Sequence, residues 1–338
     1  MKIADDIFAY IHPFGANCAV FAFKDGNDVD LLDTGIVRQF ALRLVLKGMG
    51  RDGIDPRRVR HIVHTHGHFD HVQADGYFQK RAAFAHPTVP VFAPQADLFR
   101  LAPGFNTIHW NMAHLLQRFP GQTFPRFRRA FHEMNLVFST ICGYKPPANL
   151  QGYVTGDELT LGRYRATATC TGGHTEGHAI LWAPEGPFLV TGDNDAINEA
   201  TCTFQGILES HQVCREIYAR HSSDDLLLLR GHNEVLKGEK GQEWNEKWFT
   251  DFGAISSSLL PYFQRLYERG QLVVDIGRII RLFTGYLSKI RVVELFAFMR
   301  VFVILKYLQE QGFGHMRYEK NSLWFEISPD ARDRTLEF

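Results

Sequence analysis

Three histidines and one aspartate lie within six consecutive residues: His66, His68, Asp70 and His71. Neutral imidazole and carboxylate groups are the usual ligands of zinc and of harder divalent ions. An apolar run at residues 59–63 precedes the group, and it predicts a strand that ends in a metal-binding turn. A single histidine on an apolar face is usually a satisfied core residue. A group this dense, with Gly67 inside it, is typical of a metal site.

Four further motifs come directly after or next to apolar runs. They are Leu32-Asp33-Thr34-Gly35, Gly173-His174-Thr175-Glu176-Gly177-His178, Thr191-Gly192-Asp193 and Gly231-His232-Asn233. Together with the motif at His66 they occur in the order found in one family. Over about residues 5–240 the chain resembles the metallo-β-lactamase-fold hydrolases.

The resemblance implies two divalent metal ions. His66, His68 and His174 would hold the first, Asp70, His71 and His232 the second, and Asp193 would bridge them. Water shared by the metals would be activated, because its pKa falls from about 15.7 in bulk to about 7 on zinc. The resulting hydroxide would attack a carbonyl or phosphorus centre. Asp70 is also expected to orient the hydroxide, so Asp70 and Asp193 are the expected catalytic carboxylates.

Zinc is the expected metal, because hydrolysis needs no redox change. Iron and manganese remain alternatives, since the predicted ligands are all nitrogen or oxygen donors. Thr65, Asp33 and His178 are candidates for orienting the imidazoles, while His61 and His64 lie off the motif spacing and are expected to be structural.

Composition narrows the class of protein. The 338 residues carry a formal net charge of zero, which gives no general attraction to nucleic acid or anionic membranes. The N-terminal residues lack the basic start and apolar core of a signal peptide, and no apolar run reaches about 18 residues. The five cysteines are scattered and odd in number, which favours reduced thiols and a cytoplasmic location.

Short apolar runs and turn residues predict the fold. We expect strands at 7–10, 19–23, 29–32, 59–63, 89–93, 162–168 and 179–182, and a helix at 38–49. Strands that alternate with helices predict an α/β sandwich of two sheets with flanking helices. The four-layer αββα order is implied by the resemblance, and it would occupy a catalytic domain at residues 1–244.

Residues 97–150 are rich in Phe, Arg and Pro, and the resemblance implies that they form a variable insertion. One interpretation is a pair of helices that bury their aromatic side chains. The other is a lid over the site, in which Arg126, Arg128 or Arg129 meets a substrate anion.

Residues 245–338 are predicted to form a small C-terminal module. Helices are expected at 255–268, 275–283 and 291–311, followed by strands at 315–318 and 323–327 around a turn at 319–322. Helix, helix, helix, hairpin is the order of a winged helix. The third helix is apolar on most faces, which favours packing or a homodimer contact over contact with nucleic acid or a membrane surface.

Two functions fit these observations. The first is a hydrolase of small thioesters, esters or lactones, similar to the glyoxalase II group. The alternative is an endoribonuclease-like phosphodiesterase that uses the winged-helix tail, although the chain lacks a basic surface signal. A metal-free fold used only for binding is a third interpretation, which the complete ligand set disfavours. Asp193 stands near the position of a cysteine ligand in one group of β-lactamases, which argues against antibiotic degradation.

Overall fold

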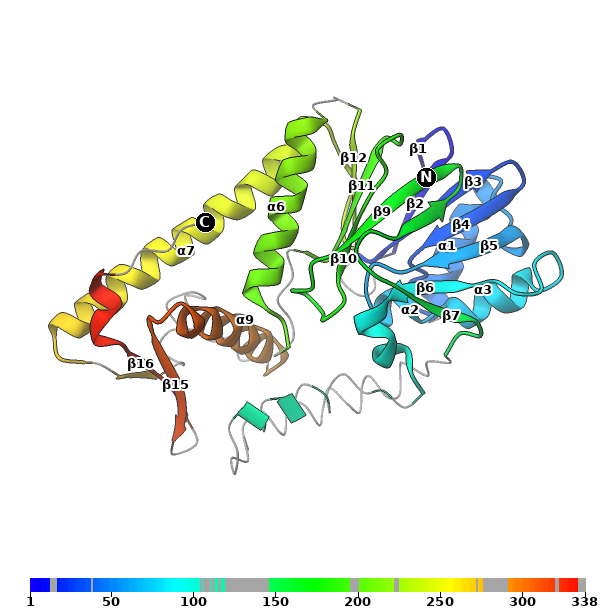
Figure 1. Ribbon diagram of the computed structural model, residues 1–338. Helices are drawn as coiled ribbons and strands as arrows, with labels where there is room; N and C mark the ends of the chain where they lie inside the picture. Colours follow the sequence, from blue (N-terminus) through cyan, green and yellow to red (C-terminus); the bar gives the residue numbers. More distant parts are fainter. Residues whose placement is uncertain are drawn as a thin grey trace.

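Two β-sheets lie face to face, with helices on their outer sides (Figure 1). The computed structural model that shows this arrangement describes residues 1–12, 17–37, 39–103, 105, 110, 113–114, 117–118, 146–194, 201–221, 225–271, 273–275, 291–319 and 322–333. The order of layers confirms the predicted αββα sandwich.

The first sheet has seven strands in chain order: β1 (Lys2–Ala4), β2 (Ile7–Ile11), β3 (Ala19–Asp25), β4 (Asp28–Leu32), β5 (Val59–Val63), β6 (Val91–Pro94) and β7 (Leu150–Tyr153). The strands from β1 to β4 pair antiparallel, and those from β4 to β7 pair parallel. Crossover connections carry the helices α1 (Gln39–Arg51), α2 (Phe69–Val72) and α3 (Asp75–Ala82). The carboxyl ends of β4 and β5 therefore lie together at one edge of the sheet.

The second sheet has six strands: β8 (Glu158–Leu161), β9 (Tyr164–Cys170), β10 (Ala179–Trp182), β11 (Phe188–Gly192), β12 (Leu227–Arg230) and β13 (Leu236–Lys237). Only β11 and β12 pair parallel, and the helix α6 (Phe204–Arg220) connects them. This crossover again places two carboxyl strand ends side by side.

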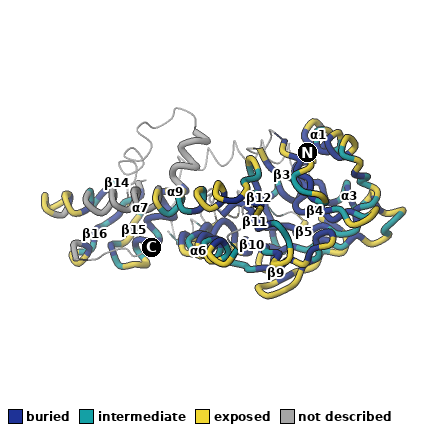
Figure 2. Tube along the Cα trace, turned by 90° about the horizontal axis from the view of Figure 1, so that it is seen from above, coloured by how far each residue is buried: buried dark blue, intermediate teal, exposed yellow. Residues whose placement is uncertain are grey.

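Successive side chains along each strand point to opposite faces of the sheet, and this alternation explains the layers. In β3, Phe21 and Phe23 enter the core between the sheets, whereas Val20 and Ala22 enter a second core that includes residues of α1 and α3. On the other side, Leu189 of β11 packs with residues of α6. Both faces of each sheet are therefore buried, which requires two helical layers outside them. The buried positions of the strands are visible in Figure 2.

The C-terminal part contains α7 (Glu239–Glu268), β14 (Val273–Asp275), α9 (Arg291–Glu310), β15 (Gly314–Glu319) and β16 (Ser322–Ile327). The three strands form a sheet in the order β14-β16-β15, and the predicted hairpin is confirmed. Asp275, where the predicted second helix begins, is the last residue of β14, and residues 276–283 lie outside the described residues, so the winged helix stays a prediction. Among the described helices, none is long and apolar enough to cross a lipid bilayer.

The helix predicted at 255–268 begins much earlier, at Glu239, and this start point was wrong. Its first half packs on α6, where Trp248 stacks on His211 at a ring distance of 4.0 Å. The sequence analysis missed a helical pattern in this stretch, because Trp244, Trp248 and Phe252 recur every four residues among polar side chains. The proposed division of the chain at residue 244 stays a prediction, and α7 crosses that position without a break.

The helix α9 is buried within the chain along its described C-terminal half. Five consecutive apolar side chains, at residues 301–305, are at most 5% exposed. Tyr307 lies against Phe204 of α6, with 4.8 Å between ring centroids. This favours the predicted packing role for the apolar helix.

Candidate metal centre

The seven predicted ligands lie on loops at neighbouring strand ends. His66 and His68 follow β5, and Asp70 and His71 lie in the short helix α2 that comes next. His174 lies between β9 and β10, Asp193 directly follows β11, and His232 follows β12. Residue 232 also forms an isolated β-bridge to Cys18, which directly precedes β3. The structure therefore brings together groups separated by more than 160 residues of sequence.

Four imidazole nitrogens converge on one carboxylate oxygen, Asp193 Oδ2. Its distance is 2.9 Å to His232 Nε2, and 3.5 Å to both His71 Nε2 and His174 Nε2. The fourth nitrogen, His66 Nε2, is 3.9 Å away. This central position matches the bridging role that the resemblance implies for Asp193.

The three-histidine half of the centre is equally tight. His68 Nδ1 lies 3.1 Å from His66 Nε2 and 2.8 Å from His174 Nε2. In the other half, Asp70 Oδ2 lies 3.6 Å from His232 Nε2. Within the described residues, three overlapping groups have all their ligand atoms within 4.8 Å of one another: His66, His68 and His174; His66, His71 and Asp193; and Asp70, His71 and His232.

Asp33 orients two of the imidazoles. Its buried carboxylate accepts hydrogen bonds from His71 Nδ1 at 2.8 Å and from the Thr65 hydroxyl at 3.1 Å. Burial raises the pKa of Asp33, but His71 and His64 lower it by a larger amount, to about 2. The carboxylate is therefore ionised. The Thr65 hydroxyl gives its single proton to this carboxylate, so it accepts from His66 Nδ1 at 3.0 Å. The rings of His71 and His66 thus direct Nε2 toward Asp193. The contacts expected of Asp33 and Thr65 with these imidazoles are present.

His178 and His64 also occupy the expected kinds of position. The backbone N–H of Asp193 donates to His178 Nε2 at 3.1 Å, so His178 contacts the backbone of the residue that is expected to bridge the metals. His64 is buried between Asp33 and Asp75, and its ring nitrogens lie 3.4 Å and 3.1 Å from their carboxylates. Both ring nitrogens of His64 therefore face these two carboxylates and not the predicted ligand atoms.

The donor set fits divalent cations. Neutral imidazole nitrogens at 2.8–3.1 Å repel one another unless a proton or a cation lies between them. Among the described residues, the buried Asp193 Oδ1 has no hydrogen-bond partner, a pattern that an ion or water explains. Burial raises the pKa of the Asp193 carboxyl, but His71 and His232 hold it well below its usual value. An ionised carboxylate among imidazoles is the arrangement in which zinc, iron and manganese are commonly bound.

Exposure distinguishes the two ends of the centre. The side chains of Asp70 and His232 are 15% and 19% exposed, while that of Asp193 is 3% exposed. His66 and His174 are fully buried. Solvent therefore reaches the centre from the Asp70 and His232 side.

Two supporting residues were missed by the sequence analysis. Cys18 Sγ donates to the carbonyl oxygen of Asp70 at 3.0 Å, and Asp97 is a fully buried carboxylate beside the histidine loops. Neither belongs to a motif, and only the position of Asp97 after a strand gives a weak signal. The proposed lid residues Arg126, Arg128 and Arg129 lie outside the described residues. In the described part of the insertion, Arg100 is buried and pairs with Glu176.

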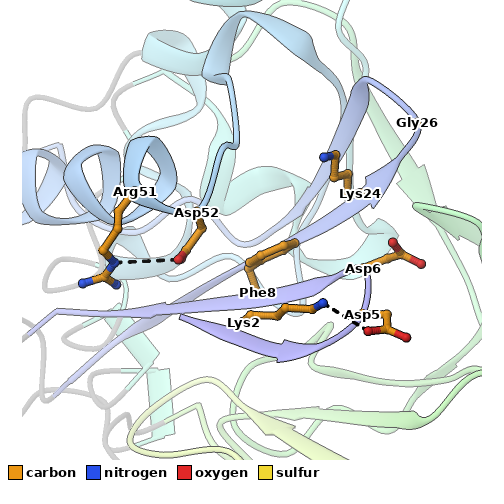
Figure 3. A pocket seen from close by; sticks show the side chains of 8 residues that line it. All are labelled: Lys2, Asp5, Asp6, Phe8, Lys24, Gly26, Arg51 and Asp52. Carbon is orange, nitrogen blue, oxygen red and sulfur yellow. Dashed lines mark hydrogen bonds and ion pairs between the residues drawn. The ribbon is translucent and has the colours of Figure 1, made fainter.

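A surface hollow of about 550 Å³ contains none of the predicted site residues (Figure 3). It is lined by Lys2, Asp5, Asp6, Phe8, Lys24, Gly26, Arg51 and Asp52. Several of its charges pair with one another, as in Lys2 with Asp5 at 3.1 Å. The hollow therefore does not compete with the histidine cluster as a reaction centre.

The family model described as the metallo-beta-lactamase superfamily matches residues 12–204. The fold is similar to that of a metallo-beta-lactamase family protein from Thermus thermophilus, with a TM-score of 0.68 and 18% identity over 96% of this chain and 100% of that chain. A beta-lactamase domain protein from Burkholderia ambifaria gives a TM-score of 0.70 and 16% identity, over 97% of this chain and 94% of that chain. No curated protein sequence gives a significant match.

A B3 metallo-beta-lactamase with an active-site glutamic acid is also similar, with a TM-score of 0.50 and 16% identity. That match covers 75% of this chain and 88% of that chain. The first two structures cover nearly the whole chain, so they share the fold of the C-terminal part as well as that of the sandwich.

Proposed function

Because the chain belongs to the metallo-beta-lactamase superfamily, we propose that it is a hydrolase that binds two divalent cations and cleaves small thioesters, esters or lactones. One observation carries this proposal. Four imidazole nitrogens surround Asp193 Oδ2 at 2.9–3.9 Å, on loops that the fold brings to one edge of the sandwich.

The geometry supports a division of the ligands into two halves. His66, His68 and His174 would hold the first cation, and Asp70, His71 and His232 the second. Asp193 would contact both, because its Oδ2 lies within 3.5 Å of His174 on one side and of His71 and His232 on the other. Zinc is the proposed metal, and iron or manganese would suit the same donors.

Bound metals would supply a lowered pKa for water and a positive charge beside the developing oxyanion. The chain's own residues would supply orientation and protection from solvent. Asp33 and Thr65 hold the rings of His71 and His66 so that each Nε2 points toward Asp193. Rings that are already oriented need not be reorganised during the reaction. Asp70 lies at the solvent-facing end, where its carboxylate can orient the attacking water and accept its proton.

The choice of small carbonyl substrates rests on charge. A nuclease neutralises several phosphates with Lys and Arg, whereas this chain has 37 basic and 37 acidic residues. The apolar helix in the C-terminal part is buried within the chain along residues 301–305, so these side chains do not form a surface for nucleic acid.

The proposal is tested by the initial rate of thioester hydrolysis on S-lactoylglutathione. Metal-reloaded protein is compared with protein treated with EDTA, and Cys170→Ala serves as a matched variant near the His174 motif. The proposal predicts a chelator-sensitive rate that Cys170→Ala retains. A rate that EDTA leaves unchanged would contradict metal-dependent hydrolysis. If metal-loaded protein is inactive on thioesters, esters and lactones but cleaves single-stranded RNA, the substrate class is wrong.

A further inference from the structure

The short helix η2 (Gln95–Leu101) lies between the two loops that carry the three-histidine half of the metal centre. Its Asp97 side chain is fully buried and accepts three hydrogen bonds. The donors are the backbone N–H of Gly67 at 2.7 Å, the Thr175 hydroxyl at 2.6 Å and the backbone N–H of Gly177 at 2.8 Å. One carboxylate thus joins the loop of His66 and His68 to the loop of His174.

The contacts of Asp97 are specific to ligand loops. Gly67 is the residue between His66 and His68, and Thr175 directly follows His174. The N–H of Gly67 and the hydroxyl of Thr175, each next to a predicted ligand, both donate to Asp97 Oδ2. Any displacement of this carboxylate would therefore change the separation between His174 and the other two histidines.

Packing reinforces this arrangement. A Cβ atom added to Gly67 would lie 2.9 Å from Arg100 Cβ and 3.1 Å from Leu101 Cδ1. Because a Cβ atom cannot rotate away from its backbone, η2 and the His66–His68 loop are in contact with no space for a further methyl group. Arg100 also compensates the buried charge, since its Nε lies 3.6 Å from Asp97 Oδ1 and 3.0 Å from Glu176 Oε2.

The half that contains His71 is held by another buried carboxylate, Asp33. Asp33 accepts from His71 Nδ1 and from the backbone N–H and hydroxyl of Thr65. The hydrogen bonds found for Asp97 in the described residues include none to residues 70, 71, 193 or 232. Asp33 therefore reaches both halves, through His71 and through Thr65 to His66, whereas the described hydrogen bonds of Asp97 reach only the loops of the three-histidine half.

We propose that Asp97 is a positioning residue that fixes the three-histidine half of the metal centre selectively. This inference rests on the proposed function, because it assigns a role toward the metals that the ligands would bind. Groups that orient metal ligands typically contribute about 10–100-fold to metal affinity. Loss of the Asp97 charge should therefore weaken one half of the centre by that factor and leave the other half nearly unchanged.

The test measures zinc affinity, by competition with a chromophoric chelator, in two backgrounds of the full chain. His232→Ala leaves the three-histidine half, and His68→Ala leaves the half that contains Asp70 and His71. Asp97→Asn is added to each. Asp157→Asn is the control, because Asp157 is an exposed carboxylate that accepts one backbone N–H, from Val154 at 2.8 Å. Thr175→Val removes a single donor and provides a second variant if Asp97→Asn folds poorly.

The inference predicts that Asp97→Asn weakens zinc binding about 10–100-fold in the His232→Ala background and less than about 3-fold in the His68→Ala background. Thr175→Val should follow the same selectivity with a smaller loss, and Asp157→Asn should change neither. An equal loss in both backgrounds, or no loss in either, overturns the positioning role. Wild-type protein that binds no zinc overturns the proposed function as well, so the two failures are distinguishable.

Discussion

Gly231 directly precedes the proposed ligand His232 and lies against Asp193, the proposed bridging carboxylate. A Cβ atom at this position would lie 2.0 Å from Asp193 Oδ1 and 2.9 Å from His71 Cε1. Ordinary van der Waals contact begins near 3.4 Å, so the carboxylate would have to move by roughly 1.4 Å. Gly231→Ala is therefore a small change aimed at the centre of the ligand set.

A displacement of this size is large compared with the distances around Asp193. Its Oδ2 lies 2.9 Å from His232 Nε2 and 3.5 Å from His71 Nε2, so no common position for all the donors would remain. We expect Gly231→Ala to lose at least one metal ion per chain. We also expect it to lower the free energy of unfolding by about 1–3 kcal/mol, which is the usual cost of inserting a methyl group into a packed interior.

Metal content by elemental analysis and urea unfolding, with and without EDTA, measure both effects. Gly76→Ala is the matched control, because Gly76 lies in α3 and an added Cβ there has no heavy atom within 4 Å. That variant should keep all bound metal and gain up to about 1 kcal/mol of stability. If Gly231→Ala binds metal and unfolds as the wild type does, the geometry around Asp193 is wrong.

Three further predictions follow from the same structure. His68→Ala and Asp193→Ala should each lose at least one metal ion and most turnover, whereas Cys170→Ala should keep full metal content by elemental analysis. Turnover of a neutral ester should hardly change with salt, because a steep loss of affinity with salt is a property of phosphate contacts; steep salt dependence would favour a nuclease. Burial lowers the pKa of His211 from 6.5 to about 3, so the unfolded state binds more protons between these values. The free energy of unfolding should therefore fall as the pH drops through that window, by up to roughly 5 kcal/mol from this residue, and His211→Gln should flatten the profile in urea unfolding. An unchanged profile would contradict the burial of a neutral His211.

The sandwich and the ligand positions could be predicted because each depends on local sequence. Apolar runs mark the strands, and a strand that ends at a motif such as Thr191-Gly192-Asp193 places its ligand at a sheet edge. The family order of the motifs then assigned partners that are far apart in the chain. Seven predicted ligands lie together for this reason.

The supporting groups could not be predicted in the same way. Asp97 is a single carboxylate in an irregular segment, and its three donors come from loops about 30 and 80 residues away in sequence. The early start of α7 is different, because Trp244, Trp248 and Phe252 recur at helical spacing and could have predicted it. The partner of that helix face could not be predicted: Trp248 packs against His211 and Phe204 of α6. Long-range packing of this kind leaves no local pattern in the sequence.

The central claim is that Asp193 lies between two metal ions. The most direct test is the number of divalent ions bound per chain by metal-reloaded wild type and by Asp193→Ala, measured by elemental analysis at equal protein concentration. The proposed function predicts two ions for the wild type and at most one for the variant. Two ions in Asp193→Ala, or none in the wild type, would contradict the claim.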